Sequence, residues 1–322
     1  MILDEIGVVA IGRNEGQRLI DCLASVKLQT NNIVYVDSGS TDGSTAAAAS
    51  FGAFVVNLDL TEAFTAARAR NEGFRALKAL EPDIRFVQFV DGDCTLSQGW
   101  LETAVAFITQ RDDVAIVSGR LSELHPTASV YNQLNDIQLE SPVGEISECG
   151  GNSLVRVKAF EAAGGFRPQL VGGEEPELCL RLRQRGWKIW QLSAQMAMHD
   201  AAMTRFSQWW VRSVKTGYGF ADVWLLHSKI WRRHMTSAVF WGGLLPVTIC
   251  FGALIHPAAL GGALAYFVQL CRIAFARGPT SSQSWVYSAV TIVSKFAFFQ
   301  GILKYLWRRL RRQAAPLIEY KL

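Results

Sequence analysis

Four short apolar runs, separated by stretches of helical periodicity, most strongly constrain the fold of the first 200 residues. The runs are IGVVAI at 6–11, NIVYVD at 32–37, AFVVNL at 53–58 and IRFVQFVDGD at 84–93. A helix is expected between the first two runs, with Leu19, Ile20, Leu23 and Val26 on one face, and another over 65–80. Alternating strands and crossover helices predict an α/β fold built on a mostly parallel sheet.

Acidic residues stand where two of these runs end. Asp37 closes the second run and leads into SGSTDGST, and the fourth closes with Asp91, Gly92 and Asp93. In open α/β sheets ligands bind beyond the carboxyl ends of the strands, so these acids are candidates for chemistry. Two carboxylates one residue apart repel each other, and a hard divalent cation relieves that repulsion while binding substrate phosphates. An ordinary solvated turn is the alternative for either segment alone.

Charge divides the chain into two unequal parts. Residues 1–203 carry 17 Lys and Arg against 26 Asp and Glu, whereas residues 204–322 carry 15 against 2. The basic part also holds the long apolar stretches, so its charge favours anionic lipid rather than nucleic acid as a partner. Six single cysteines without a CxxC pair suit a reducing compartment, and acids near the N-terminus do not resemble a signal peptide.

Three apolar stretches in the basic part predict attachment to a membrane. Residues 235–255 and 258–276 are each about long enough to span a bilayer, for which ~20 residues suffice. Basic residues flank this pair on both sides, which predicts that its flanks and the first part of the chain lie in the cytoplasm. Residues 285–312 contain Lys295 near the middle and four arginines at the end, which favours an interfacial helix. A soluble helical core is the alternative.

Six segments in order resemble a known family. They are VVAIGRNE, VDSGSTDGST, ARARNEG, VDGD, CGGN and GGEEPEL, and together they look like the motifs of family 2 inverting glycosyltransferases. The resemblance covers residues 6 to about 200 and implies the GT-A fold, an α/β sheet flanked by helices. Here a membrane-associated helical region follows it.

The resemblance assigns roles to individual residues. It places the nucleotide-sugar at Ala10, Asn14, Glu15, Asp37, Arg70, Asp91, Gly92, Gly151 and Asn152. It implies a Mg²⁺ or Mn²⁺ ion held by Asp93, together with Asp91 and His199. A buried core position for Ala10, a solvated helix face for Arg70 and a structural role for His199 are the alternatives.

The catalytic base falls in an acidic pair that departs from the family pattern. The family usually has Glu-Asp where this chain has Glu174 and Glu175, and its second acid deprotonates the acceptor hydroxyl. Glu175 is therefore the expected base, with Glu174 an open alternative. Acids at the start of a helix also serve as caps. A base near a metal and a diphosphate must accept a proton at neutral pH, which an acid shielded from water does once its pKa is raised.

A segment after residue 203 partly resembles the gating segment of membrane polysaccharide synthases. It contributes Gln208, Trp209, Trp210 and Arg212 to an expected acceptor or diphosphate side. The synthase order of Gln, two spacers, Arg and Trp is not reproduced, and the two tryptophans could instead be interfacial anchors.

These observations predict a catalytic domain over 1–203, amphipathic basic and aromatic helices over 204–234 and membrane-associated helices over 235–322. The expected function is metal-dependent, inverting transfer of a sugar from a nucleoside diphosphate, with UDP favoured. The expected acceptor is lipid-linked or membrane-proximal, in surface polysaccharide or glycolipid synthesis at the cytoplasmic membrane. A non-catalytic nucleotide-sugar-binding scaffold is one alternative. A nucleotidyltransferase is another, although IGRNEGQR lacks the lysine-bearing phosphate loop that such an enzyme needs.

Overall fold

The computed structural model describes residues 5–62, 64–228 and 230–311. The chain forms two compact units. The first comprises Met1–Leu170 and Glu174–Thr204, and the second comprises Val171–Gly173 and Arg205–Leu322. The short segment Val171–Gly173 therefore belongs to the second unit although it lies within the sequence of the first.

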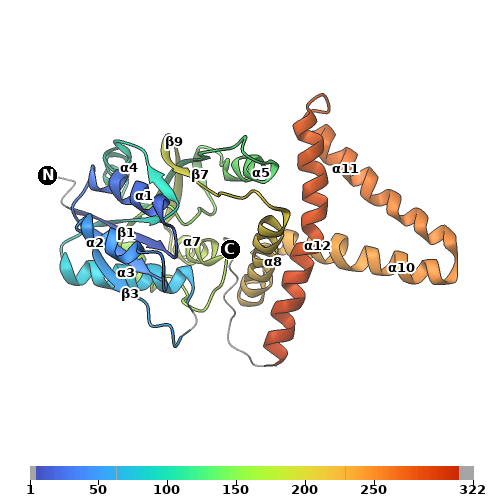
Figure 1. Ribbon diagram of the computed structural model, residues 1–322, viewed down its shortest axis with the longest axis horizontal. Coiled ribbons are helices and arrows are strands. Elements are labelled where there is room, and N and C mark those ends of the chain that lie inside the picture. The colour runs from blue at the N-terminus through green and yellow to red at the C-terminus, as the bar shows by residue number, and fades with distance from the viewer. Residues whose placement is uncertain (1–4, 63, 229, 312–322) are drawn as a thin grey trace. The chain divides into compact units, whose positions relative to one another are not determined.

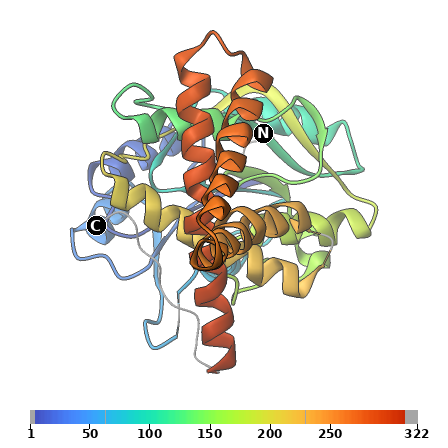
Figure 2. The same cartoon turned by 90° about the vertical axis from the view of Figure 1, so that its right-hand side faces the viewer.

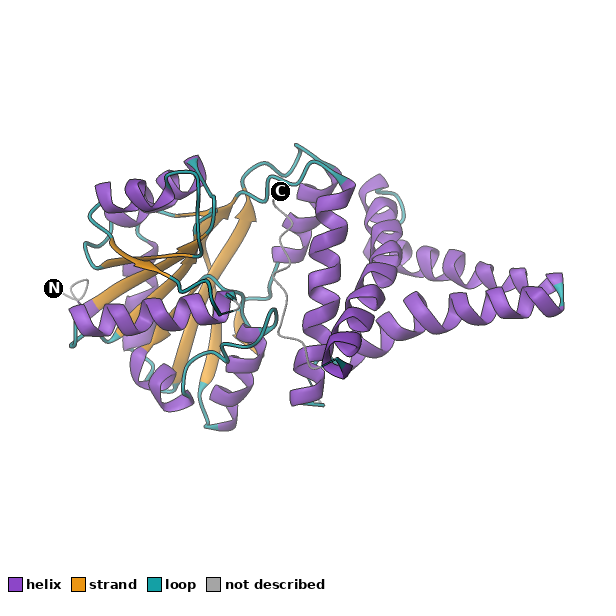
Figure 3. Cartoon of the chain, turned by 60° about the horizontal axis from the view of Figure 1, so that its bottom comes forward, coloured by secondary structure: helices purple, strands orange, loops and turns teal. Residues whose placement is uncertain are grey.

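A nine-stranded mixed sheet forms the centre of the first unit (Figures 1 and 3). Its strands are β1 (Ile6–Gly12), β2 (Ile33–Asp37), β3 (Phe54–Asn57), β4 (Phe86–Asp91), β5 (Cys94–Leu96), β6 (Val114–Glu123), β7 (Gly144–Ile146), β8 (Ser153–Arg156) and β9 (Lys188–His199). The order is β3-β2-β1-β4-β8-β6-β9-β5, with β7 also paired to β9. The first four strands in this order, β3, β2, β1 and β4, run parallel to one another. Strand β8 is antiparallel to both of its neighbours, β4 and β6. The predicted α/β sheet is confirmed.

Helices cover both faces of this sheet (Figure 3). They are α1 (Gln17–Lys27), α2 (Ser44–Ser50), α3 (Ala66–Leu80), α4 (Trp100–Thr109), α5 (Val130–Leu139), α6 (Val157–Ala163) and α7 (Glu174–Gln184). Leu19 and Leu23 of α1 are buried in one core cluster with Trp100 of α4. Leu77 of α3 and Leu182 of α7 are buried in the other. Apolar residues on two faces of the strands explain why the predicted runs are continuous rather than alternating.

Strand register aligns the polar ends that the sequence places far apart. Asp37 of β2 pairs with Gly12 at the end of β1, and Asp91 of β4 pairs with Ile11. At the other side of the sheet, His199 of β9 pairs with both Cys94 of β5 and Glu123 of β6. These pairings bring acidic and imidazole side chains to the carboxyl ends of the strands, where α/β proteins bind their ligands.

Helices make up most of the second unit (Figures 1 and 2). They are α8 (Phe206–Leu226), α9 (Arg232–Val239), the π-helical turn η2 (Phe240–Leu244), α10 (Leu245–Ile255), the 3₁₀ segment η3 (Pro257–Ala263), α11 (Leu264–Arg277) and α12 (Ser282–Leu310). Helix α12 packs closely on α8, since a Cβ atom on Gly217 would lie 2.1 Å from the Phe298 carbonyl oxygen. Close backbone approach of this kind requires glycine at the contact.

Three helical stretches of this unit are long and apolar enough to cross a membrane. They are Arg232–Ile255, Pro257–Arg277 and Ser282–Leu310. Large apolar side chains are exposed along them, including Leu254, Ile255 and Phe267. Exposed apolar surface of this extent suggests association with a membrane. The interfacial position expected for 285–312 stays a prediction, and its last residue, Arg312, lies outside the described residues.

The segment Val171–Gly173 is held by α8 and its neighbours within the second unit. Val171 is buried in a cluster with Tyr218 and Ile302. A Cβ atom on Gly173 would lie 2.6 Å from the ring of Trp231, so only glycine fits there. The Asp222 carboxylate interacts with the Val171 backbone, and burial raises the pKa of Asp222 to about 6. This segment leads directly into Glu174, the first residue of α7.

Candidate active site

Arg70 joins three of the acidic residues that the sequence singles out. Its Nη1 lies 3.1 Å from Glu174 Oε1 and 3.0 Å from Glu175 Oε1, and its Nη2 lies 2.8 Å from Asp91 Oδ1. Arg70 is buried on α3, and its Nε has no hydrogen-bond partner among the residues that the structure describes. The guanidinium holds the carboxylates of β4 and α7 together.

Glu175 has the electrostatics of a base that works near neutral pH. Burial and the neighbouring charge of Glu174 raise the pKa of Glu175 to about 7, although the Arg70 charge opposes the rise. Glu174 is more deeply buried, its side chain being 7% exposed against 17% for Glu175. Glu175 thus combines a raised pKa with partial exposure of its carboxylate, as a general base requires.

Because Gly151 has no side chain, the Arg70 guanidinium has room beside it. A Cβ atom on Gly151 would lie 2.0 Å from Arg70 Nη2 and 2.9 Å from Glu175 Oε1. Any side chain at this position would displace the guanidinium from its carboxylates. Gly150, its neighbour, has open space where a Cβ atom would stand. The two adjacent glycines thus differ in their importance for the site.

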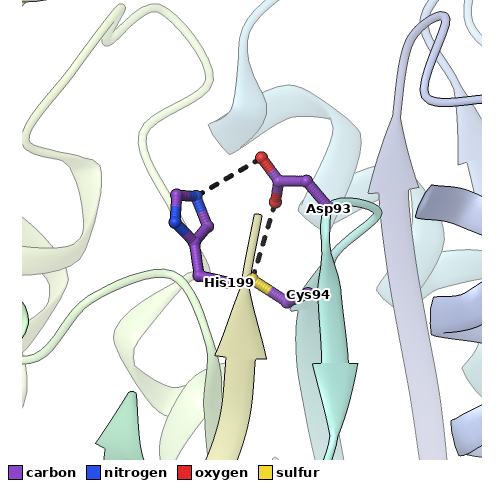
Figure 4. Close-up of side chains that lie close together, drawn as sticks. All are labelled: Asp93, Cys94 and His199. Carbon is purple, nitrogen blue, oxygen red and sulfur yellow. Dashed lines mark hydrogen bonds and ion pairs between the residues drawn. The ribbon is translucent and has the colours of Figure 1, made fainter. Parts of the chain in front are cut away.

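Asp93, Cys94 and His199 form a second cluster, at the ends of β5 and β9 (Figure 4). All three are buried, and His199 Nε2 faces Asp93 Oδ2 at 3.5 Å. The Cys94 thiol contacts Asp93 Oδ1 at 3.5 Å, and burial together with the Asp93 charge raises the pKa of Cys94 well above its usual range. Without a cation Cys94 is a neutral thiol, and the Asp93 carboxylate and His199 imidazole offer the oxygen and nitrogen ligands of this group.

The donor set fits a hard or borderline divalent cation. Carboxylate oxygen suits Mg²⁺ and Mn²⁺, and imidazole is a common ligand of first-row transition metals. A buried carboxylate beside a buried imidazole nitrogen also supplies charge of the right sign for such an ion. Asp91 lies two residues before Asp93, and its carboxylate is bound to Arg70.

Glu123 completes this cluster from the opposite side of the His199 ring. Its Oε2 lies 2.9 Å from His199 Nδ1 and accepts a hydrogen bond of 2.8 Å from Asn135 Nδ2. Its Oε1 accepts the Ala201 N–H at 2.8 Å. Burial opposes ionisation of Glu123, but the contacts with His199, Ala201 and Asn135 outweigh it, so the pKa of Glu123 lies below its ordinary value.

The loops after β1 and β2 are tied to each other. Asn14 has a positive φ of 52°, its Oδ1 accepts the Thr41 N–H at 2.7 Å, and its own N–H donates to Ser40 Oγ. Asp37 Oδ2 accepts the N–H groups of Gly39 and Ser40 at 2.9 and 2.7 Å. These bonds fix a turn of small residues at the strand ends, as nucleotide-binding sheets require.

The other residues expected to bind the nucleotide-sugar also lie in the first unit, and each has different contacts there. Ala10 is fully buried in the sheet core. Glu15 is buried and forms an ion pair of 2.9 Å with Arg18. Asn152 Oδ1 accepts the Asp91 N–H at 2.9 Å and so fixes the end of β4. The Gly92 N–H donates to the Ile11 carbonyl.

The residues expected on the acceptor side lie on α8 of the second unit. The Gln208 side chain accepts the Arg205 N–H at the start of the helix, and Trp210 Nε1 donates to Gln300 of α12 at 2.8 Å. Trp209 is buried, and Arg212 stands on the same helix. Their role toward an acceptor stays a prediction.

Sequence reasoning missed Glu123 and Asn135. Glu123 closes β6, a strand with a run of six buried residues, just as Asp37 and Asp91 close β2 and β4. The same rule, an acid at the carboxyl end of a buried strand, would have found it. Asn135 gives no such signal, because an amide within an amphipathic helix looks like an ordinary surface residue.

Several known proteins that are similar to this chain are glycosyltransferases. Residues 8–164 match the family model described as Glycosyl transferase family 2. Glycosyltransferase AglE of Haloferax volcanii is 25% identical over 256 residues, which cover 75% of this chain and 81% of that protein. A pre-mycofactocin glycosyltransferase of Mycobacterium tuberculosis is 30% identical over 172 residues, which cover half of this chain and 35% of that protein.

Solved structures share the fold. The mannosyltransferase PcManGT from Pyrobaculum calidifontis, solved with GDP-Man and Mn²⁺, has a TM-score of 0.62 at 16% identity. That match covers 95% of this chain and 88% of the other. TarS 1–349 of S. aureus has a TM-score of 0.51 at 14% identity, covering 96% and 92% of the two chains. At these identities the likeness concerns the fold alone.

Proposed function

We propose that this glycosyltransferase, whose residues 8–164 form a family 2 domain and whose first unit has the GT-A fold, transfers one sugar from a nucleoside diphosphate to a membrane-bound acceptor with inversion. The observation that carries the proposal is the Arg70 network, which joins Asp91 to the acidic pair Glu174 and Glu175. It combines a buried cation, a polar strand end and a carboxylate whose pKa is raised to about 7. Sugar transfer from a diphosphate needs groups of each kind.

Glu175 is the proposed base. Its carboxylate takes the proton from the acceptor hydroxyl as that oxygen attacks the anomeric carbon and the bond to the diphosphate breaks. One displacement of this kind inverts the anomeric configuration. Arg70 holds the Glu175 carboxylate in place.

Asp93 and His199 are the proposed ligands of a divalent cation. They face each other at 3.5 Å, and a bound Mg²⁺ or Mn²⁺ ion would supply positive charge for the departing diphosphate. Asp37 and the turn that it fixes are proposed to lie beside the nucleoside. The GDP-Man complex of PcManGT makes a GDP-sugar a donor to test alongside the UDP-sugars that the sequence favours.

The exposed apolar helices support a membrane-bound acceptor. A lipid-linked sugar presents its hydroxyl groups at the bilayer surface, within reach of a membrane-attached enzyme. The proposed location is the cytoplasmic membrane with the first unit in the cytoplasm, since basic residues flank the candidate spans.

A donor panel tests this proposal. Detergent-purified full-length protein is incubated with UDP-, GDP- and dTDP-sugars and membrane lipid extract, with Mn²⁺ or EDTA, and nucleoside diphosphate release is measured. We expect release from one nucleotide class, abolished by EDTA and by Asp93→Ala, and lowered about 10²- to 10⁴-fold in Glu175→Gln. Donor binding without turnover under every condition would contradict the proposal and favour a nucleotide-sugar-binding scaffold.

A further inference from the structure

We infer that Glu123 is a positioning residue that orients His199 for metal binding, with Asn135 supporting its carboxylate. The inference rests on the proposed role of His199 as a metal ligand. It adds to that role a second layer of residues, which decides how firmly the imidazole is held.

Hydrogen bonds hold the Glu123 carboxylate in one orientation. Its side chain is fully buried, and its two oxygens receive three partners: the His199 ring, the Asn135 amide and the Ala201 N–H. These partners come from β9, α5 and the segment after His199. Asp136, next to Asn135 on α5, also accepts the Glu123 N–H at 2.8 Å. Carboxylate and ring are therefore fixed relative to each other from three directions.

The chemistry of these groups selects the form of the ring that binds metal. Asn135 Nδ2 donates to Glu123 Oε2 and also lies 3.1 Å from His199 Nδ1, so the contact of 2.9 Å between Nδ1 and Oε2 is a hydrogen bond when Nδ1 carries the proton. The lone pair of the neutral ring then stands on Nε2, the nitrogen that faces Asp93 Oδ2 at 3.5 Å. A carboxylate behind a ligating histidine fixes the tautomer and raises the basicity of the ligand.

If the pair of Glu123 and His199 served stability alone, the Nε2 edge of the His199 ring would need no particular neighbour. Here that side faces a second buried carboxylate, Asp93, which has its own contact with Cys94. Carboxylates on opposite edges of the imidazole suit a ring whose Nδ1 donates a proton to Glu123 and whose Nε2 binds a cation together with Asp93. The order carboxylate, histidine, metal follows from this placement.

Mn²⁺ binding by the full-length protein in detergent tests the inference without relying on activity. Free Mn²⁺ is counted by electron paramagnetic resonance, and a ligating imidazole is detected by its ¹⁴N modulation in the echo signal. Four proteins are compared: wild type, His199→Ala, Glu123→Gln and Asn132→Ala. Asn132 is a matched control, because it is buried on α5 and binds the Met203 N–H and the His125 carbonyl. Its loss loosens the same region without removing a contact to the His199 ring.

We expect wild type to bind Mn²⁺ with ¹⁴N modulation and His199→Ala to lose that modulation. Glu123→Gln should bind about 10- to 100-fold more weakly, whereas Asn132→Ala should keep the wild-type affinity. Wild-type affinity in Glu123→Gln, or an equal loss in Asn132→Ala, would overturn the role of Glu123 while leaving the metal site in place. Unchanged Mn²⁺ binding in His199→Ala would instead overturn the proposed metal role of His199, and the inference with it.

Discussion

Arg70 shares one guanidinium among three carboxylates, and Gly151 makes this possible. Because a Cβ atom at Gly151 would stand 2.0 Å from Arg70 Nη2, Gly151→Ala should push the guanidinium away from Asp91 and Glu175. Breaking a buried ion pair of this kind costs about 3–5 kcal/mol. We therefore expect a marked fall in donor turnover and in the thermal unfolding temperature.

Gly150→Ala is the matched control for that change. The neighbouring position has nothing within 4 Å of an added Cβ atom, so turnover and stability should stay close to those of the wild type. Equal effects of the two substitutions would show that the loop, rather than the Arg70 contact, is sensitive.

The raised pKa of Glu175 predicts how activity depends on pH. A base must be deprotonated, and burial raises the pKa of Glu175 to about 7, so kcat/KM should rise with pH and level off above about 7. The profile of Glu175→Gln, at its much lower rate, should lack this rise. A wild-type profile that is flat from pH 5 to 8 would contradict the assignment of Glu175 as the base.

The same titration of Glu175 should lower the stability of the folded protein as pH rises, whereas it raises the activity. The folded-state pKa lies above the ordinary value of 4.5, so the folded protein binds the extra proton and loses stability as pH rises through the window from about 4.5 to 7. Glu175→Gln removes this group from the titration. Its unfolding temperature should therefore fall less steeply than that of the wild type across the same window.

Most of the candidate site was accessible to sequence reasoning at the level of residue type. Asp91, Asp93 and the pair Glu174 and Glu175 stand at positions that the motifs mark, and the structure places them in two neighbouring clusters. That Arg70 binds the acids themselves was not predicted, because a long side chain can turn toward a ligand or toward a carboxylate. The Glu123 and Asn135 contacts depend on strand register, which no local motif reveals.

At the scale of elements, the apolar runs predicted the strands well. All four runs became β1, β2, β3 and β4, and the helix expected over 65–80 is α3 at Ala66–Leu80. Thr65 accepts the Arg68 N–H as the cap of that helix. The antiparallel strand β8 was not predicted, because Ser153–Arg156 is short and its pairing with β4 and β6 joins distant segments. Long-range pairing of this kind is set by tertiary packing.

Close packing of α8 on α12 gives a prediction for the second unit. An added Cβ atom on Gly217 would lie 2.1 Å from the Phe298 carbonyl oxygen, and backbone atoms cannot yield as a flexible side chain can. Gly217→Ala should therefore destabilise the helical unit by about 1–3 kcal/mol, measured as a lower unfolding temperature in detergent. Gly261→Ala in η3, where nothing lies within 4 Å, is the control and should unfold like the wild type. An unchanged Gly217→Ala protein would contradict the packing of α8 on α12.

For the whole molecule, charge and apolar helices together predict how the chain meets the membrane. If Arg232–Ile255 and Pro257–Arg277 both span, with their basic flanks on the cytoplasmic side as proposed, the turn at His256 reaches the far side and the first unit lies in the cytoplasm. A cysteine replacing Leu28, which is 83% exposed, should react with an impermeant maleimide only from the cytoplasmic side. A cysteine replacing His256 should react only from outside, with the labelled sites identified by mass spectrometry. Labelling of both from one side would contradict the two-span arrangement.

Sugar transfer to lipid tests the proposed reaction most directly. Membranes containing the full-length chain are given a radiolabelled donor from the active nucleotide class, and label in the organic extract is counted for wild type, Asp93→Ala and Glu175→Gln, with and without EDTA. We expect lipid-borne label in the wild type alone and only when a divalent cation is present. Label of equal amount in Asp93→Ala and Glu175→Gln, or undiminished by EDTA, would contradict the proposed metal-assisted transfer with Glu175 as the base.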